Sequence, residues 1–188
     1  MAKAYILMNC DLGSEIDVIS SLKNIDGIKE AHGTLGLYDI VAKIELGSEE
    51  KIREVVTGVI RKMPKIHSTL TLTRSESEEL FQTSEKLLGA ILGQNLAQAY
   101  VVVHCKNGEE YTILKNICHI PEVKEADVVF GLYDVICKIQ ASDNKTLENV
   151  ITKDIRALHY IESSMTLNII NEQEQRTEEI LDRHMMVN

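Results

Sequence analysis

Side chains that could bind a metal or act as nucleophiles are scattered along this sequence. The four cysteines are Cys10, Cys105, Cys118 and Cys137, and no two form a Cys-x-x-Cys pair. Neighbouring residues of a strand point to opposite faces, so the adjacent His104 and Cys105 do not readily share one ion. Free cysteines also serve as small core hydrophobes. The spacing disfavours zinc ribbons and disulfide scaffolds, leaves metal binding as a minor alternative, and favours a reduced, cytoplasmic chain.

Catalytic motifs are missing from the sequence as well. It holds no His-Glu-x-x-His, Gly-x-Ser-x-Gly, phosphate-binding loop or Gly-x-Gly-x-x-Gly pattern. The candidate acids and bases Asp39, His67, His104 and Asp134 are far apart, and no nucleophile–base–orienter set follows from their spacing. We therefore expect no enzyme and no cofactor, with a small α/β-barrel enzyme as a minor alternative.

The tetrapeptide Gly-Leu-Tyr-Asp occurs twice, at 36–39 and 131–134. A shift of 95 residues places Ala4–Leu72 on Ala99–Leu167 without a gap, and about a third of the aligned positions are identical. A match of this length predicts two homologous domains. We expect domains at 1–75 and 98–170, a helical linker at 76–97 and a helical tail at 171–188.

Hydrophobic periodicity gives the same order of elements in each unit. In the first unit the pattern predicts strands at 5–10, 28–35, 38–46 and 66–72. Helices are predicted at 13–22 and after Ser48, a capping residue, with Pro64 at the end of the second. The order β-α-β-β-α-β is the ferredoxin-like pattern, so the expected fold is α+β, with two tandem units of the dimeric α/β-sandwich type and an extra helix after each.

Alternation along the strands also predicts which residues share a sheet face. We expect the helices to cover a face that includes Ile6, Ile40, Leu70 and Leu72. The opposite face of the first unit is predicted to carry Tyr5, Leu7, Asn9, Asp39, Val41, Lys43, Thr69 and Thr71. In the second unit it is predicted to carry Tyr100, Val102, His104, Asp134, Ile136, Lys138, Ser164 and Thr166. This face is half apolar, so it is best buried against the matching sheet of the same chain, or alternatively of another chain.

Composition narrows the functional classes. The chain has 188 residues and is 44% hydrophobic, so it can bury a core. Its formal net charge is −9, which disfavours binding to the phosphate backbone of nucleic acids. The longest apolar runs are far shorter than the ~20 residues of a membrane span. We expect no direct nucleic-acid binding and no membrane insertion.

Each unit resembles the RAM domain, the effector-binding half of the leucine-responsive/asparagine (Lrp/AsnC) transcription regulators. The resemblance rests on Ile25–Ala31, Gly36–Ile40 and the strand that begins at Ile66, with their second copies at Ile120–Ala126, Gly131–Val135 and Ile161. Unlike those regulators, the sequence starts directly with a strand, so no winged helix-turn-helix is expected in it. The resemblance implies sandwich dimers that assemble further and bind amino acids between dimers, near the Gly-x-Tyr-Asp turn and the last strand.

On this resemblance the predicted ligand-binding residues are Gly36, Tyr38, Asp39, Thr69, Thr71, Gly131, Tyr133, Asp134, Ser164 and Thr166. Glycine allows close backbone approach, turn N–H groups can hold a carboxylate, and aspartate can receive an ammonium group. The alternative interpretation is structural, with Asp as a turn residue and Tyr packed at an interface.

The predicted function is therefore a tandem ligand-sensing and assembly module that binds an amino acid or similar small effector. It would act in transcription regulation, through a DNA-binding regulator as a possible partner, without contacting DNA itself. A purely structural assembly module is the alternative. Exposed edge strands and the apolar stripes of the two extra helices predict a homo-oligomer, a dimer or larger.

Overall fold

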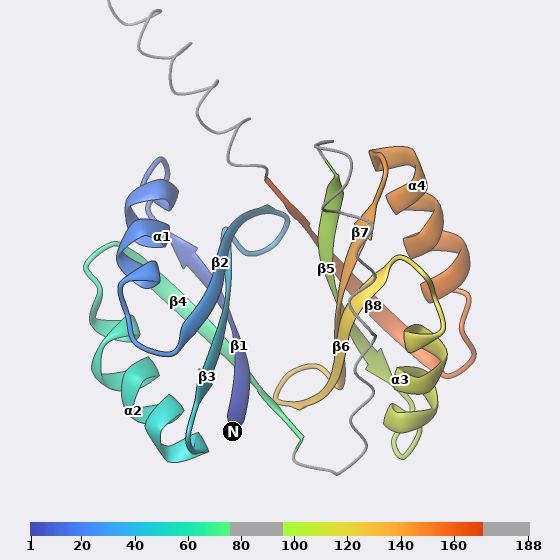
Figure 1. Ribbon diagram of the computed structural model, residues 1–188, viewed down its shortest axis with the longest axis horizontal. Helices are drawn as coiled ribbons and strands as arrows, with labels where there is room; N and C mark the ends of the chain where they lie inside the picture. The colour runs from blue at the N-terminus through green and yellow to red at the C-terminus, as the bar shows by residue number, and fades with distance from the viewer. Residues whose placement is uncertain (76–95, 171–188) are drawn as a thin grey trace, which may run out of the picture.

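The computed structural model describes residues 1–75 and 96–170, and each range forms one βαββαβ unit (Figure 1). The first unit contains β1 (Ala2–Cys10), α1 (Glu15–Lys23), β2 (Ile28–Leu35), β3 (Ile40–Leu46), α2 (Glu49–Gly58) and β4 (Ile66–Arg74). The second contains β5 (Ala97–Cys105), α3 (Glu110–Cys118), β6 (Val123–Phe130), β7 (Val135–Ala141), α4 (Asn144–Asn149) and β8 (Ile161–Ile169). The predicted α+β fold of two ferredoxin-like units is confirmed.

Local sequence signals account for most element boundaries. The Ser48 side chain accepts a hydrogen bond from the Lys51 N–H and begins α2, as predicted, and Asp143 does the same for α4 through Thr146. A 3₁₀ turn, Ile60–Lys62, separates α2 from Pro64, and a π-helical stretch, Val150–Ile155, continues α4. None of the described helices is long and apolar enough to cross a membrane. The helices expected within 76–97 and 171–188 lie outside the described residues, except that Ala97 already begins β5.

The two sheets join edge to edge into a closed barrel with the strand order β1-β3-β2-β8-β5-β7-β6-β4. Strands β2 and β8 pair at one seam through Thr34 and Ile169. Strands β4 and β6 pair at the other seam through Thr73 and Phe130. The edges predicted to remain open for other chains are thus paired within this one, because each unit supplies the strand that the other lacks.

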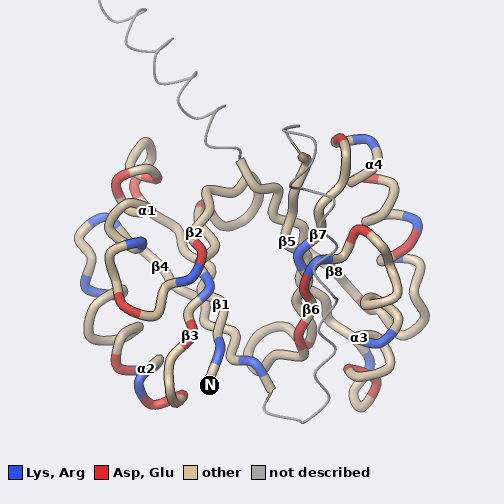
Figure 2. Tube along the Cα trace, in the orientation of Figure 1, with Lys and Arg blue, Asp and Glu red and all other residues tan. Residues whose placement is uncertain are grey.

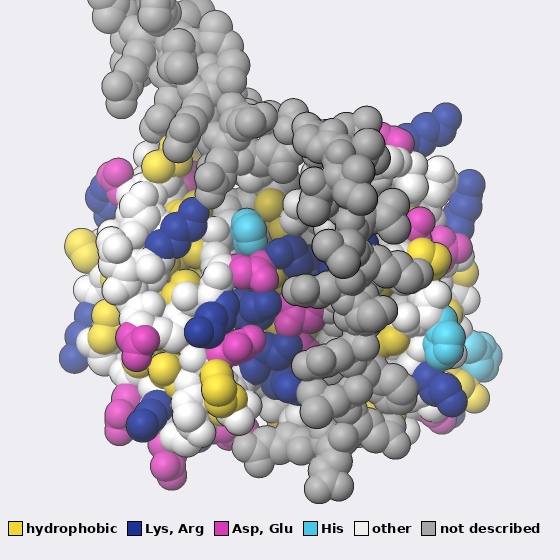
Figure 3. All heavy atoms as spheres, viewed as in Figure 1, with side chains coloured by type: hydrophobic (Ala, Val, Ile, Leu, Met, Phe, Trp, Pro, Cys, Tyr) yellow, Lys and Arg dark blue, Asp and Glu magenta, His cyan; other side chains and the backbone are white. Residues whose placement is uncertain are grey.

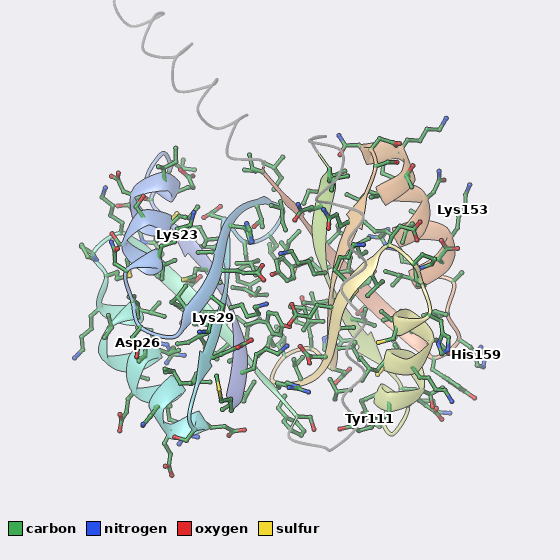
Figure 4. The ribbon with its side chains drawn as sticks, viewed as in Figure 1. Lys23, Asp26, Lys29, Tyr111, Lys153 and His159 are labelled. Atoms are coloured by element: carbon green, nitrogen blue, oxygen red, sulfur yellow. The ribbon has the colours of Figure 1, made fainter. Side chains whose placement is uncertain are left out.

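Three hydrophobic clusters form within residues 1–75 and 96–170. Two lie between a sheet and its own helices, with α1 and α2 outside the first sheet and α3 and α4 outside the second (Figure 1). The third lies between the sheets and contains Tyr5, Leu7, Val41, Leu72, Tyr100, Val102, Val129, Ile136 and Leu167. Figure 4 shows side chains of both sheets meeting there, while the labelled Lys153 and His159 point outward. The prediction that the half-apolar faces cover each other within one chain is confirmed.

The predicted faces of β4 and β8 are wrong. Tyr5 lies opposite Leu72 and Ile6 opposite Thr71, so Leu70 and Leu72 face the second sheet while Thr69 and Thr71 face the helix side. The same holds in β8, where Val101 lies opposite Thr166 and Val103 opposite Ser164. Apolar and polar residues alternate cleanly in these strands, but buried clusters lie on both sides of each sheet, so alternation alone could not decide whether the apolar side meets the helices or the other sheet.

Candidate functional site

The first Gly-Leu-Tyr-Asp turn is tied to the strands beside it. Oδ2 of Asp39 accepts the N–H of Cys10 at 2.9 Å, where β1 changes register, and the Asp39 N–H donates to the Met8 carbonyl at 2.9 Å. The Thr34 hydroxyl donates to the carbonyl of Tyr38 at 2.8 Å. The Asp39 carboxylate therefore fixes the β1 bulge, which supports the structural interpretation of this residue.

The second turn repeats this arrangement with one addition. Oδ2 of Asp134 accepts the Cys105 N–H at 2.9 Å and also lies 3.3 Å from Nδ1 of His104. The His104 ring is 4.7 Å from the ring of Tyr133, centroid to centroid. Since the first unit has Asn9 at the position of His104, the two turns carry different side chains beside the same aspartate.

Each motif glycine lies against the other unit. Gly36 has a φ of +156°, and a Cβ there would stand 2.8 Å from Cδ2 of Leu167 and 3.0 Å from the carbonyl oxygen of Thr166. Gly131 has a φ of +146°, and a Cβ would stand 2.9 Å from Cδ2 of Leu72. Side chains other than glycine are strained in this conformation and would clash, so the glycines allow each turn to approach the last strand of its neighbour.

The two motif tyrosines are partly buried against the cluster between the sheets. The Tyr133 hydroxyl lies 3.8 Å from Sδ of Met165. Burial, together with the nearby Tyr38, raises the pKa of Tyr133. This placement fits the expectation of an interface tyrosine, and it leaves the phenol protonated at neutral pH.

The predicted hydroxyl residues lie on the outer side of the barrel, beside an arginine in each unit. Nε of Arg61 donates to the Thr69 hydroxyl at 2.9 Å, and Nε of Arg156 donates to the Ser164 hydroxyl at 3.0 Å. Among the described side chains, the buried hydroxyl oxygen of Thr71 has no hydrogen-bond partner. Arg61 and Arg156 were missed at the sequence level, although their identity in both copies was a signal.

The structure therefore assembles the predicted residues into two separate groups. Gly36 and Gly131 meet the backbones of Thr166 and Thr71 from the other unit, which is a contact between units that the sequence did not reveal. Asp39 and Asp134 instead face the bulges of β1 and β5. Neither aspartate is hydrogen-bonded to the hydroxyls of β4 or β8 among the described contacts.

A network of charged side chains crosses the space between the sheets, and the sequence analysis missed it. Its members alternate in sign: Arg74, Asp127, Lys3, Glu125, Lys43, Glu30 and Lys138. Figure 3 shows basic and acidic side chains gathered in the middle of the molecular face that is turned to the viewer. Figure 2 shows charged positions on the strands of both sheets. The contacts include 2.9 Å from Arg74 to Asp127 and 3.0 Å from Lys43 to Glu125.

The network is partly withdrawn from water. The side chain of Asp127 is 7% exposed and that of Lys43 is 12% exposed. Burial acts to raise the pKa of Glu30, but hydrogen bonds from His32, Lys138 and Lys43 outweigh it and hold the pKa far below its usual value. The carboxylate therefore stays ionised at neutral pH.

The cysteines are poorly placed for chemistry. Cys105 and Cys137 lie in the core between the second sheet and its helices, and burial raises the pKa of the Cys137 thiol to about 12. A protonated thiol is a weak ligand and a weak nucleophile. Within residues 1–75 and 96–170, no three His, Cys, Asp or Glu side chains are grouped to hold a metal ion.

The fold and the paired turns define a tandem ferredoxin-like protein in which two βαββαβ units close one barrel. Residues 98–178 match the profile of the Lrp/AsnC ligand binding domain, and the chain belongs to this family. Residues 1–75 form a second copy of the same unit. The predicted resemblance is thereby confirmed.

Three comparisons describe the similarity further. The solved structure of FFRP-DM1 is 35% identical and covers 40% of this chain and 100% of its own, with a TM-score of 0.39. The siroheme decarboxylase NirDL is 11% identical but covers 98% of this chain and 79% of its own, with a TM-score of 0.62, which shows a shared fold across both units. Homocitrate synthase of Sulfurisphaera tokodaii is 28% identical over 109 residues. That match covers 55% of this chain, which spans only 23% of the synthase.

Proposed function

We propose that the chain is an effector-sensing module of the Lrp/AsnC type that binds an amino acid or a similar small molecule at its two seams. The observation that carries this proposal is the match of residues 98–178 to a ligand binding domain. The close approach of Gly36 to Thr166, and of Gly131 to Thr71, supports a seam location, because it joins predicted residues of different units. A ligand held there would touch both units at once.

The chemistry of β4 and β8, the last strands that form the seams, suits an amino acid. The guanidinium groups of Arg61 and Arg156 beside the β4 and β8 hydroxyls can receive a carboxylate, and the unpaired Thr71 hydroxyl can add a hydrogen bond. Asp39 and Asp134 already hold a backbone N–H, so we assign them first to fixing the turns and only second to an ammonium group.

A thermal melt of the full chain with each of the twenty amino acids tests this proposal. Binding to the folded state raises stability by about 2.7 kcal/mol at a ligand concentration of 100 Kd. We expect at least one amino acid to raise the melting temperature with saturation. No rise with any of them, for a protein that unfolds cooperatively, would contradict the proposal and favour the pure assembly module.

A second candidate is the regulatory domain of a biosynthetic enzyme. It is favoured by the 28% identity to a stretch of homocitrate synthase. The two functions require different partners, a DNA-binding regulator for the first and a biosynthetic enzyme for the second. Gel filtration of the chain with a DNA-binding Lrp/AsnC regulator, and separately with a synthase, would show which complex forms and whether an amino acid changes it.

The remaining expectations concern partners and location. With a net charge of −9 we expect the chain not to bind DNA directly, and we expect it to be cytoplasmic and without catalytic activity. We also expect self-association through outer surfaces, since the sheet edges are already paired. Light scattering at micromolar concentration tests the last point, and a mass of 21.1 kDa would refute it.

A further inference from the structure

Most ion pairs of the charged network between the sheets join the two units, and Lys43–Glu30 is a pair within the first unit. Arg74 and Lys3 of the first unit contact Asp127 of the second, at 2.9 Å and 2.7 Å. Lys43 of the first unit contacts Glu125 of the second, and Lys138 of the second contacts Glu30 of the first. Positive and negative side chains thus alternate along the space between the sheets, from the β4–β6 seam toward the β2–β8 seam.

The network departs from the sequence repeat at three positions. Tyr5, Glu30 and Lys43 have the same residues at their counterparts Tyr100, Glu125 and Lys138. The counterparts that differ are Gln98 for Lys3, Asp127 for His32 and Ile169 for Arg74. All three differences lie in or beside the network, and two of them remove a positive charge from the second unit while the third adds a negative one.

These differences give the two sheet faces opposite net charge. The first unit brings Lys3, Lys43 and Arg74 against Glu30, with His32 beside it. Glu45 lies opposite Lys3 in the β1–β3 ladder, and including it still leaves the first face positive. The second unit brings Glu125 and Asp127 against Lys138 alone, so its face is negative.

We propose that this pattern makes the sheet face of residues 1–75 selective for the face of residues 96–170 and rejects a second copy of itself. Two first units face to face would set Arg74 and Lys3 against His32, where Asp127 now stands. Two second units would place Asp127 beside a glutamine and an isoleucine, with neither Lys3 nor Arg74 to pair it. Like charges withdrawn from water without partners are strongly unfavourable, which is how charged interfaces exclude wrong partners.

The selectivity has a consequence for assembly. Identical units can pair in any combination, whereas this chain contains one face of each kind and so completes its barrel alone or by reciprocal exchange with a second chain. Larger assemblies must then use surfaces outside the barrel. Every chain also retains both seams, and with them both turns of the proposed effector site.

Transposing the faces within the full chain tests the proposal. One variant carries Lys3→Gln, His32→Asp and Arg74→Ile, which gives both units the second face. Another carries Gln98→Lys, Asp127→His and Ile169→Arg, which gives both units the first face. A third carries all six changes, so that the two faces are exchanged but remain complementary. A swap of the exposed pair Asp17 and Lys65 serves as the control.

We expect each half transposition to lower the melting temperature by at least about 10 °C, because it leaves buried charges unpaired. The sixfold variant should recover more than half of that loss, with the mass of the parent protein, and the control should melt like the parent. Half transpositions that melt within about 2 °C of the parent would overturn the proposal. So would a sixfold variant no more stable than the worse half transposition.

Discussion

The hydroxyl of Tyr5 donates a hydrogen bond to Oδ2 of Asp127, 2.5 Å away, across the space between the two units. Both residues are buried, and burial, followed by the charges of Asp127 and Glu125, raises the pKa of the tyrosine well above its ordinary value. Tyr5 therefore remains a hydrogen-bond donor at neutral pH. This bond joins residues 122 positions apart and belongs to the contacts that hold the barrel closed.

Tyr5→Phe should lower the free energy of unfolding by about 1–3 kcal/mol, because it removes one donor from a buried carboxylate. Tyr100→Phe is the matched control. Its hydroxyl contacts Glu30 at a longer 3.2 Å, and the Glu30 side chain is 25% exposed, whereas that of Asp127 is 7% exposed. Urea unfolding of both variants measures the difference, and a larger loss for Tyr100→Phe would contradict this account.

Acid should destabilise the protein as the two network glutamates become protonated. Burial acts to raise the pKa of Glu30 and of Glu125, but lysine hydrogen bonds, and His32 for Glu30, lower both pKa values below that of the unfolded chain. The unfolded state therefore binds these protons first, so the stability is present above the ordinary glutamate pKa of 4.5 and is lost as pH falls below it.

We expect the melting temperature to fall progressively as the pH drops below about 5 and to keep falling below about pH 3. Glu30→Gln should be less stable at pH 7 and show a flatter acid profile, whereas Glu54→Gln, at an exposed position, should follow the parent curve. Parallel profiles for the parent and Glu30→Gln would argue against a role of this carboxylate in acid unfolding.

Gly131→Ala should cost about 2–4 kcal/mol of stability, since it combines a φ of +146° with a Cβ 2.9 Å from Leu72 and 3.1 Å from the Thr71 carbonyl oxygen. Gly58→Ala is the control, because Gly58 ends α2 and a Cβ there would meet nothing within 4 Å. This substitution should leave the free energy of unfolding unchanged or raise it slightly. Chemical denaturation gives both values. Equal effects would mean that the turn yields to accommodate a side chain.

Thr71→Val separates stability from ligand binding. The buried Thr71 hydroxyl has no partner among the described side chains, so its removal should leave stability unchanged or raise it by about 1 kcal/mol. If the hydroxyl serves an effector, the same variant should bind the stabilising amino acid several-fold more weakly. Thr166→Val removes a 3.4 Å contact from Arg156 and tests ligand binding at the β2–β8 seam in the same way. Unchanged affinity in both variants would exclude these hydroxyls from the site.

Periodicity predicted most of the fold because each βαββαβ unit keeps its local signals. Ser48 caps α2, and the alternation of apolar residues with Lys43 and Glu45 identifies β3. The gapless repeat then fixed the second unit by comparison with the first. Such signals are local, so each can be identified without knowledge of the tertiary contacts.

The contacts between the units could not be predicted in the same way. The inward face of β4 is set by the pairing of Tyr5 with Leu72, which no local pattern encodes. The role of Gly36 depends on Leu167, more than a hundred residues away, and the pairing of Arg74 with Asp127 depends on the β4–β6 seam. The differences between the two copies at Lys3, His32 and Arg74 were visible in the sequence. Their role in charge pairing could be recognised only once the contacts between the two units were known.

Equilibrium dialysis measures whether this chain binds a small amino-acid effector. The full chain is dialysed against each of the twenty amino acids in radiolabelled form, with the Thr71→Val and Thr166→Val variants in parallel. We predict that at least one amino acid accumulates on the protein side, saturates with no more than two molecules per chain, and accumulates less with the variants. Equal concentrations on both sides of the membrane for all twenty, at protein concentrations of about 100 μM, would contradict the claim.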